Sequence, residues 1–191
     1  LMDIVEMPQE DHSQDTLVTE FEAQHKLEGI GLELKELNYA YHTGTEVFLN
    51  ANLNAYPHEI IALVGPSGEG KTLLSLLKPQ NGDLSVCSGA NFSKKISLSP
   101  STRKLFSYVP QGNTMFSGTI AENMRIVKPE ATDAEIIEAL KLACAWEFVA
   151  KLPDGIQSEI KERGGGLSEG QAQRLSIARA LLRKSPILLL D

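Results

Sequence analysis

Residues 59–78, "EIIALVGPSGEGKTLLSLLK", decide the fold of this chain. The apolar run at residues 59–64 is typical of a buried strand, and the run after Lys71 is typical of a helix. A glycine-rich loop joins the two segments. A strand that enters a helix through such a loop indicates an α/β fold.

The loop "GPSGEGKT", residues 65–72, satisfies the motif G-x-x-x-x-G-K-[ST]. Its glycines let backbone N–H groups converge on phosphate oxygens, and the helix that begins near Gly70 adds the positive end of its dipole. Lys71 supplies a positive charge for the β and γ phosphates, and Thr72 offers a hydroxyl to Mg²⁺. The alternative is a glycine turn before an ordinary helix. The position between a buried strand and a helix favours the phosphate-binding loop.

The last residues, "SPILLLD", predict a second, fully buried strand that begins after Pro186 and ends at Asp191. The carboxyl ends of strands carry the chemistry in α/β sheets. An acid after an apolar strand is common, so Asp191 alone is weak support for a site. Together with the phosphate loop, it predicts a carboxylate that holds the water shell of Mg²⁺.

Alternating side chains at residues 32–41 and 46–56 predict two or three antiparallel strands. Further strands are expected at residues 83–89 and 104–110. Residues 1–27 are polar and acidic, with no lasting periodicity, so we expect a linker without regular structure there.

Two helix starts can be predicted from capping boxes. Thr132 precedes Glu135 by three residues, and Ser168 precedes Gln171 by three residues. The second helix is expected to end at Pro186, which cannot continue it.

The composition indicates a soluble globular protein, with 42% hydrophobic and 23% charged residues among 191. The net charge of −7 argues against a nucleic-acid partner. No apolar run approaches the roughly 20 residues that span a bilayer. The cysteines and histidines match no metal-binding spacing, which favours structural or surface roles and a reducing compartment. They are Cys87, Cys144, His12, His25, His42 and His58.

The segment "LSEGQAQRLSIARALL", residues 167–182, lies between the phosphate loop and "ILLLD". In this order the three segments resemble those of the ATP-binding-cassette (ABC) ATPases, whose signature is usually L-S-G-G-Q. Gln111, in "YVPQGNTMFSGTIAENM", is similar to the Q-loop residue of that family, and "KERGGGLS" to the cross-contact loop of exporters. The resemblance covers about residues 30–191.

The resemblance implies an α/β P-loop NTPase (RecA-like) core with an N-terminal antiparallel β subdomain and a helical signature subdomain at about residues 113–183. The ABC domain would occupy residues 28–191 and be incomplete at its C-terminus. Residues 1–27 would be a linker from a preceding membrane domain, because "LMDIVEMPQED" resembles the end of the last membrane helix in fused exporters.

The same resemblance implies a role for each site residue, with ATP and Mg²⁺ as ligands. Lys71, Gln111 and Asp191 would be catalytic, and Thr72, Gln111 and Asp191 would hold the metal. Tyr41 would stack on adenine, although Tyr39 and Tyr56 are near. The nucleotide-binding residues would be Tyr41, Gly65, Pro66, Ser67, Gly68, Glu69, Gly70, Lys71, Thr72 and Leu73. The signature residues Ser168, Glu169, Gly170 and Gln171 would contact the ATP of a partner cassette.

Three departures from the family pattern stand out. Glu169 replaces the first signature glycine, and its charge would weaken phosphate binding unless it points away. Residues 77–106 fit the pattern poorly. The catalytic carboxylate expected after Asp191 and the later switch histidine are absent, so we expect a piece of a longer polypeptide that hydrolyses little or no ATP by itself.

The function expected from the resemblance is the ATP-binding and ATP-hydrolysing subunit of an exporter, in which ATP-driven dimerisation is coupled to transport. Its partners would be a second cassette, identical or not, and a fused transmembrane domain at the cytoplasmic side of the inner membrane. Two alternatives remain open. One is a degenerate, non-hydrolysing cassette of a heterodimer, and the other is a soluble ABC ATPase without a membrane partner.

Overall fold

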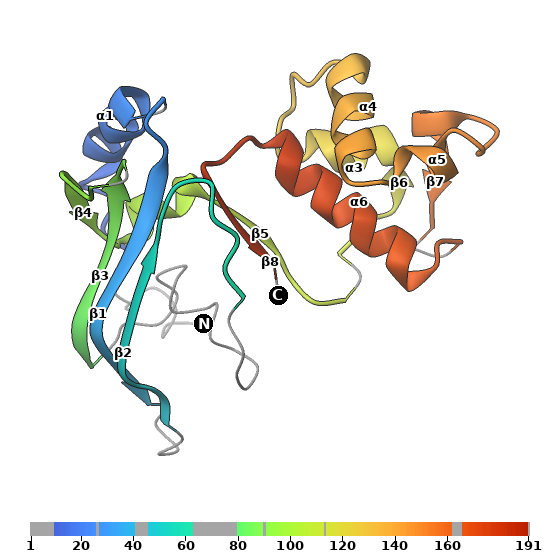
Figure 1. Ribbon diagram of the computed structural model, residues 1–191. Coiled ribbons are helices and arrows are strands. Elements are labelled where there is room, and N and C mark those ends of the chain that lie inside the picture. Colours follow the sequence, from blue (N-terminus) through green and yellow to red (C-terminus); the bar gives the residue numbers. More distant parts are fainter. Residues whose placement is uncertain are drawn as a thin grey trace, which may run out of the picture. The chain divides into compact units, whose positions relative to one another are not determined.

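The computed structural model describes residues 10–25, 27–40, 46–62, 80–89, 91–112, 114–161 and 166–190 (Figure 1). The chain forms two compact units, residues 1–106 (unit 1) and 107–191 (unit 2). The phosphate loop, Tyr41 and Asp191 lie outside the described residues.

Unit 1 is built around an antiparallel sheet in the order β2-β1-β3-β4. Its strands are β1 (Ile30–Ala40), β2 (Glu46–Ala55), β3 (Asn81–Ser88) and β4 (Lys95–Ser97). Leu32 and Leu34 of β1 are buried, as are Leu84 and Val86 of β3. The predicted antiparallel strands and the strand at residues 83–89 are confirmed.

The ladder of β1 is interrupted at Glu36, whose φ is +48°. The side chain of Asn52 fills part of the gap, because its Oδ1 accepts the Glu36 N–H at 3.0 Å. Opposite the break lies Gly82, with φ +97°. A Cβ atom there would lie 2.6 Å from the Glu36 carbonyl oxygen, so the close approach of β1 and β3 requires glycine.

A helix, α1 (Asp15–His25), forms where the sequence predicts no regular structure. Val18 and Phe21 are buried, so two apolar side chains suffice to dock a helix that lacks a sustained apolar face. α1 packs against the 3-10 helix η1 (Pro100–Leu105). Lys104 Nζ donates hydrogen bonds to the Asp15 carbonyl and the Thr19 hydroxyl.

The strand predicted from Glu59 is not formed at residues 59–62. The chain instead makes a turn, in which the Glu59 N–H donates to the Tyr56 carbonyl at 3.2 Å and the Glu59 carboxylate accepts the Tyr56 N–H at 2.9 Å. Ile60 is fully exposed. An apolar run forms a buried strand only where neighbouring strands pair with it, and no described residue pairs with residues 59–62.

The described residues of unit 2 form four α-helices and two small sheets (Figure 1). The helices are α3 (Ile120–Arg125), α4 (Asp133–Leu142), α5 (Trp146–Val149) and α6 (Glu169–Leu182), with the 3-10 helix η2 (Gly155–Gln157). β5 (Phe106–Val109) pairs with β8 (Ile187–Leu190), and β6 (Gly118–Thr119) pairs antiparallel with β7 (Glu159–Ile160).

Two strand predictions in this region need correction. β5 begins at Phe106 rather than Lys104, because residues 104–105 belong to η1. β8 begins after Pro186 as predicted but is not fully buried: Leu188 and Leu190 are 38% and 63% exposed. Leu188 and Leu190 point to the same side of the strand, and among the described residues β8 pairs with β5 alone.

Helices α3, α4 and α6 begin with capping boxes. Both predicted boxes are confirmed, at Thr132 and Ser168. A third box was not predicted: Thr119 caps α3, and the Glu122 side chain bonds back to the Thr119 N–H. α6 ends at Leu182, before Pro186, because Lys184 adopts a left-handed conformation with φ +57°.

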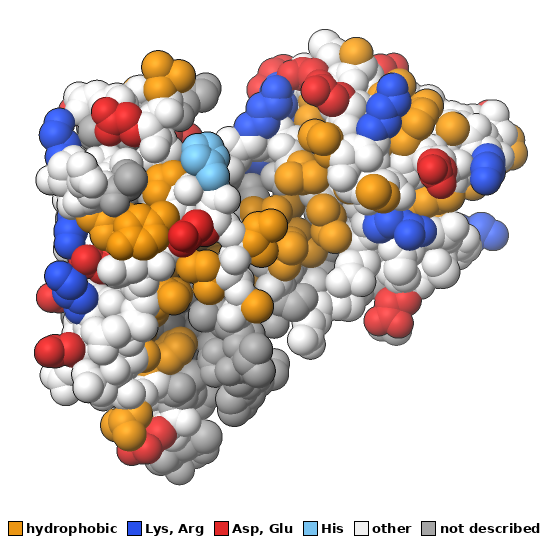
Figure 2. All heavy atoms as spheres, viewed as in Figure 1, with side chains coloured by type: hydrophobic (Ala, Val, Ile, Leu, Met, Phe, Trp, Pro, Cys, Tyr) orange, Lys and Arg blue, Asp and Glu red, His pale blue; other side chains and the backbone are white. Residues whose placement is uncertain are grey.

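One apolar cluster joins the helices of unit 2. Its fully buried members include Ile120, Met124, Ile136, Leu140, Leu175 and Leu182. Other apolar side chains of the unit are exposed, among them Phe116, Ile126 and Leu142. Figure 2 shows hydrophobic side chains on the visible surface of these helices, interspersed with charged ones. Within the described part of the chain, no helix has both the length and the hydropathy needed to cross a membrane.

Candidate functional site

Gln111 stands two residues after the end of β5. Pro110 lacks a backbone donor and so favours the end of the strand at this point. The Gln111 side chain is exposed, and Gly112 follows with φ +80°, which turns the chain away from the strand. The carboxamide of Gln111 is therefore free to meet a ligand from solvent.

The start of α6 is a well-formed helix N-terminus. Ser168 Oγ accepts the Gln171 N–H at 3.3 Å, and Gln171 Oε1 accepts the Ser168 N–H at 2.9 Å. Ser168, Glu169 and Gly170 are exposed. Apart from its chain neighbours and the backbone of its own helix, a Cβ atom placed on Gly170 would meet no described atom within 4 Å. An anion can therefore approach the backbone of the first turn closely, where the helix dipole favours negative charge.

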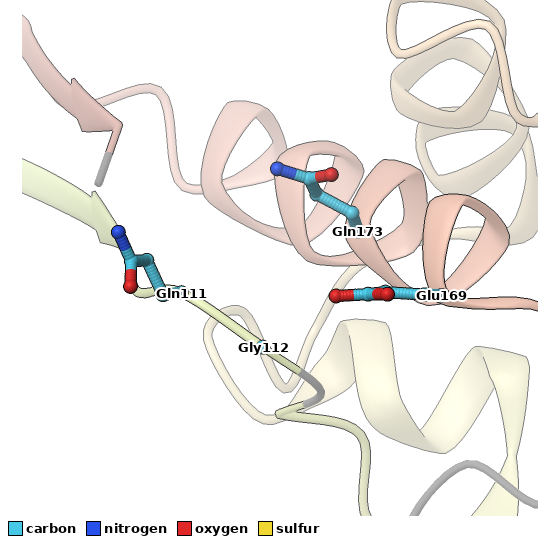
Figure 3. Close-up of a pocket in the computed structure, with 4 residues that line it drawn as sticks. All are labelled: Gln111, Gly112, Glu169 and Gln173. Carbon is cyan, nitrogen blue, oxygen red and sulfur yellow. The ribbon is translucent and has the colours of Figure 1, made fainter.

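A pocket of about 520 Å³ separates these two features, lined by Gln111, Gly112, Glu169 and Gln173 (Figure 3). Glu169 and Gln173 are one helical turn apart, so both project from the same face of α6. In Figure 3 the Glu169 side chain points along this face toward the loop of Gln111 and Gly112. Gln111, predicted for the nucleotide of its own chain, and Glu169 of the signature thus line one pocket.

The pocket and the start of α6 suit ligands of different charge. Glu169 is the only charged residue that lines the described part of the pocket, which otherwise offers the neutral carboxamides of Gln111 and Gln173. Such a lining suits hydrogen-bonding or cationic groups. The backbone at Gly170 instead suits a phosphate. The Glu169 side chain points toward the loop of Gln111 and Gly112, which lines the pocket with it.

Two pocket residues, Gly112 and Gln173, were missed by the sequence analysis. Gln173 could have been found from helical spacing, since it lies four residues after Glu169. Gly112 gives no comparable signal, because its contribution depends on the path of the loop after β5.

The remaining predicted site residues cannot be placed. Tyr41, the loop from Gly65 to Leu73, and Asp191 lie outside the described residues. The two other tyrosines near the predicted adenine-stacking position, Tyr39 and Tyr56, lie within the described residues. Tyr39 is buried, and Tyr56 stacks on Phe92 with ring centroids 4.8 Å apart at 15°. Tyr39 thus offers no open ring face, and one face of Tyr56 is covered.

The two cysteines are free thiols in different surroundings. Cys87 is buried in β3, and burial raises the pKa of its thiol to about 11, so it is a poor nucleophile. Cys144 is exposed. Across the described ranges, no group of three His, Cys, Asp or Glu side chains is placed to hold a metal ion.

Comparison with known proteins decides the family. The sequence model of the ABC transporter family matches residues 48–191. The chain belongs to this family. Its fold is that of the ABC ATPase domain, a P-loop NTPase with an antiparallel sheet, so the fold class predicted from the resemblance is confirmed.

Several relatives of this ABC chain are described as export proteins. A Rickettsia conorii protein described as an export ATP-binding/permease protein is 41% identical over 170 residues, which cover 85% of this chain and 29% of the relative. A Staphylococcus aureus protein described as a multidrug export ATP-binding/permease protein is 39% identical over 165 residues, covering 84% of this chain and 28% of the relative.

A solved structure supports the same assignment. The structure of a bacterial Atm1-family ABC exporter with ATP bound matches with a TM-score of 0.73 and 29% identity, over 85% of this chain and 29% of that chain. This chain thus spans less than a third of the length of the relatives it matches. It corresponds to an ABC transporter ATP-binding domain of the kind found in exporters.

Proposed function

We propose that this chain is the ATP-binding and ATP-hydrolysing cassette of an exporter and that it works as one of a pair. The export ATP-binding/permease relatives support the transport role. The observation that carries the pairing is the start of α6, where Ser168 caps an exposed first turn and Gly170 leaves room for a phosphate. One chain carries one such helix start and one phosphate loop, so two chains can form two composite sites.

In this proposal the ATP phosphates of one cassette lie on its own loop, Gly65 to Leu73. Lys71 balances their charge, and the Tyr41 ring packs on the adenine. The residues Ser168 to Gln171 of the second cassette offer backbone N–H groups and the helix dipole to the same γ-phosphate. The chain contributes mainly positioning and charge stabilisation to the transfer of the phosphoryl group to water.

Magnesium fits the donors available. The exposed carboxamide oxygen of Gln111 is an oxygen ligand of the kind that Mg²⁺ accepts, and the Thr72 hydroxyl and the Asp191 carboxylate would complete the set. Bound there, the ion would neutralise charge on the phosphate oxygens.

The domain boundaries follow from the same proposal. Residues 1–27 link a membrane domain to the cassette at residues 28–191, whose helical subdomain covers about residues 113–183. The cassette works at the cytoplasmic face of the inner membrane, and no nucleic acid takes part.

The experiment mixes two inactive variants of the complete transporter. Lys71→Ala removes the charge from the phosphate loop, and Ser168→Arg blocks the start of α6. Each variant alone has two damaged sites. In the mixed dimer the altered phosphate loop of one chain faces the altered α6 start of the other chain. Both changes therefore fall in one site, and the second site is intact. We expect neither variant alone to occlude ATP and the mixed dimer to occlude it at one of its two sites.

Two results would contradict the proposal. A mixed dimer that forms by crosslinking but occludes no ATP would refute the composite site. Unchanged ATP affinity in Lys71→Ala would refute the assignment of the phosphate loop itself. A Thr132→Ser variant, which keeps its helix cap, serves as the control for handling and assembly.

Glu169 favours a second candidate, a cassette that binds ATP without hydrolysing it. Its carboxylate lines the pocket beside Gln111, where it could displace a reacting water or metal ligand. A Glu169→Gly variant separates the two functions. Under the first proposal its turnover stays near that of the parent, whereas the second predicts that the parent binds ATP without releasing phosphate and that the glycine variant gains turnover.

A further inference from the structure

The loop that follows Gln111 is held to α6 by a chain of hydrogen bonds. Arg179 Nη1 donates to the Thr114 carbonyl at 3.2 Å, and Arg179 Nη2 donates to Thr114 Oγ1 at 2.8 Å. Thr114 Oγ1 lies 2.9 Å from Ser176 Oγ, which itself donates to the Ala172 carbonyl at 3.1 Å. The Ser176 proton is thus committed to Ala172, so the Thr114 hydroxyl donates to Ser176 and accepts from Arg179.

Burial strengthens this chain of bonds. Ser176 is 3% exposed, and the burial of Arg179 lowers the pKa of its guanidinium. Among the described ion pairs, none includes Arg179. Its two nitrogens are directed instead to the carbonyl and hydroxyl of one threonine. Hydrogen bonds from a charged donor are about twice as strong as neutral ones, and a partly buried donor left without a partner is costly.

A second anchor lies two residues further along. The buried Asn123 of α3 accepts the Phe116 N–H at 2.9 Å and donates to the carbonyls of Phe116 and Thr119 at 2.9 and 3.0 Å. Both anchors belong to unit 2. Gln111 therefore lies in a short segment of the chain between the end of β5 and the anchored residue Thr114.

Gln111 precedes Thr114 by three residues, which span at most about 10 Å when fully extended. The contacts of Thr114 with Arg179 therefore tie the chain to α6 close to Gln111. The Arg179 and Ser176 contacts make Thr114 follow α6, whose first residues are the signature.

We propose that Thr114, held by Arg179 and Ser176, is a positioning residue that couples Gln111 to α6. The inference rests on the proposed function, in which Gln111 serves the ATP of its own cassette and the start of α6 serves the ATP of the partner. Engagement of the partner's phosphate at Ser168 and Gly170 then acts through α6 and Thr114 on Gln111.

The test measures ATP hydrolysis by the complete transporter with the variant Thr114→Val. Valine keeps the branched shape but removes the hydroxyl that joins Arg179 to Ser176. We expect kcat to fall about tenfold, the order expected for losing a hydrogen bond to a charged group, with KM for ATP changed less than about twofold. Thr114→Ser, which keeps the hydroxyl, should restore kcat.

A double-mutant cycle separates positioning from a general structural role. If Thr114 acts through Gln111, the same Thr114→Val change should cause little further loss of kcat in a Gln111→Ala background. A purely structural effect would lower kcat by the same factor in both backgrounds. Arg183→Gln, which changes an exposed arginine just past α6, is the matched control and should leave kcat unchanged.

The outcomes distinguish this inference from the proposed function. If Lys71→Ala abolishes turnover but Thr114→Val keeps parental kcat, or lowers it equally in both backgrounds, the positioning role is wrong and the proposed function stands. If Lys71→Ala leaves turnover unchanged, both fail together. Thermal unfolding checks that each variant is folded, and Arg179→Lys, which cannot make the paired contact, replaces Thr114→Val if the latter does not fold.

Discussion

Units 1 and 2 are held together in different ways. In unit 1 the long strand β1 pairs on both edges, with β2 and with β3, a strand that begins more than forty residues further along the chain. Unit 2 has shorter strands, and its helices pack around one apolar cluster. Backbone pairing between distant segments therefore dominates in unit 1, whereas locally specified helices and side-chain packing dominate in unit 2.

The two units also repair breaks in regular structure differently. In unit 1 an asparagine side chain replaces a missing ladder bond, as Asn52 does at Glu36. In unit 2 the loop after β5 is tied by side chains of α3 and α6. The repair in unit 1 stabilises the sheet, whereas the ties in unit 2 hold the loop that carries Gln111.

The largest expected effect tests whether the two units are independent. Leu175→Ala removes a fully buried side chain from the cluster of unit 2 and should lower the free energy of unfolding by about 2–5 kcal/mol. Leu142→Ala, at an exposed position on α4, is the control and should have little effect. Hydrogen exchange should show faster opening of α4 and α6 with protection of β1 and β3 retained. Equal loss of protection in all four elements would mean that the units unfold as one.

The next test sharpens the role of backbone pairing in unit 1. Gly82→Ala places a Cβ atom against the backbone of residues 35–37 at a φ of +97°, so we expect a loss of about 1–3 kcal/mol in urea unfolding. Gly155→Ala in unit 2 is matched, with φ +53° and no described atom within 4 Å of the added Cβ. It should cost only about 1 kcal/mol, the left-handed penalty alone. Equal costs would show that the close approach of β1 and β3 contributes nothing.

A smaller effect is expected for the helix caps of unit 2. Thr132→Ala removes the oxygen that accepts the Glu135 N–H and should destabilise the protein by about 1 kcal/mol. Thr132→Ser keeps that oxygen and should restore most of the loss. Chemical denaturation measures both variants. A serine variant as unstable as the alanine variant would exclude capping as the cause.

The smallest effect concerns pH and the pair Lys128–Glu135 on the surface of unit 2. The hydrogen bond from Lys128, helped by the Thr132 N–H, lowers the pKa of Glu135 from 4.5 to about 2. A lowered carboxyl pKa stabilises the fold above pH 4.5, and this contribution is lost as the pH falls from 4.5 toward 2. The melting temperature should therefore fall more steeply over this range in the parent than in Lys128→Gln. Identical pH profiles would contradict the pairing, and added salt should reduce the difference.

Particular residues show which structural features were predictable. The capping boxes at Thr132 and Ser168 were predicted because a cap depends on residues only three positions apart. The antiparallel strands of unit 1 were predicted from alternation, but their register shift at Glu36 was not. Helix α1 was missed because two buried side chains, Val18 and Phe21, leave no periodic pattern.

The site residues also divide into those predicted from local motifs and those that were missed. Gln111 and the residues Ser168 to Gln171 were found from short motifs, and the structure places them in a loop after a strand and at a helix start. Gln173 and Gly112, which complete the pocket, were missed. Thr114, Ser176 and Arg179 were missed as well, because their contacts join residues more than sixty positions apart.

The sequence by itself determined the family, the order of the motifs and the helix starts at Thr132 and Ser168, because each depends on chemical groups within a few residues of one another. Only the tertiary structure decided which faces are covered. It exposed Ile60 and one face of β8, docked α1, turned Glu169 toward Gln111, and tied Thr114 to Arg179. The physical reason is that burial and long-range hydrogen bonds depend on which distant segments are brought together, and a local pattern of residue types carries no record of those partners.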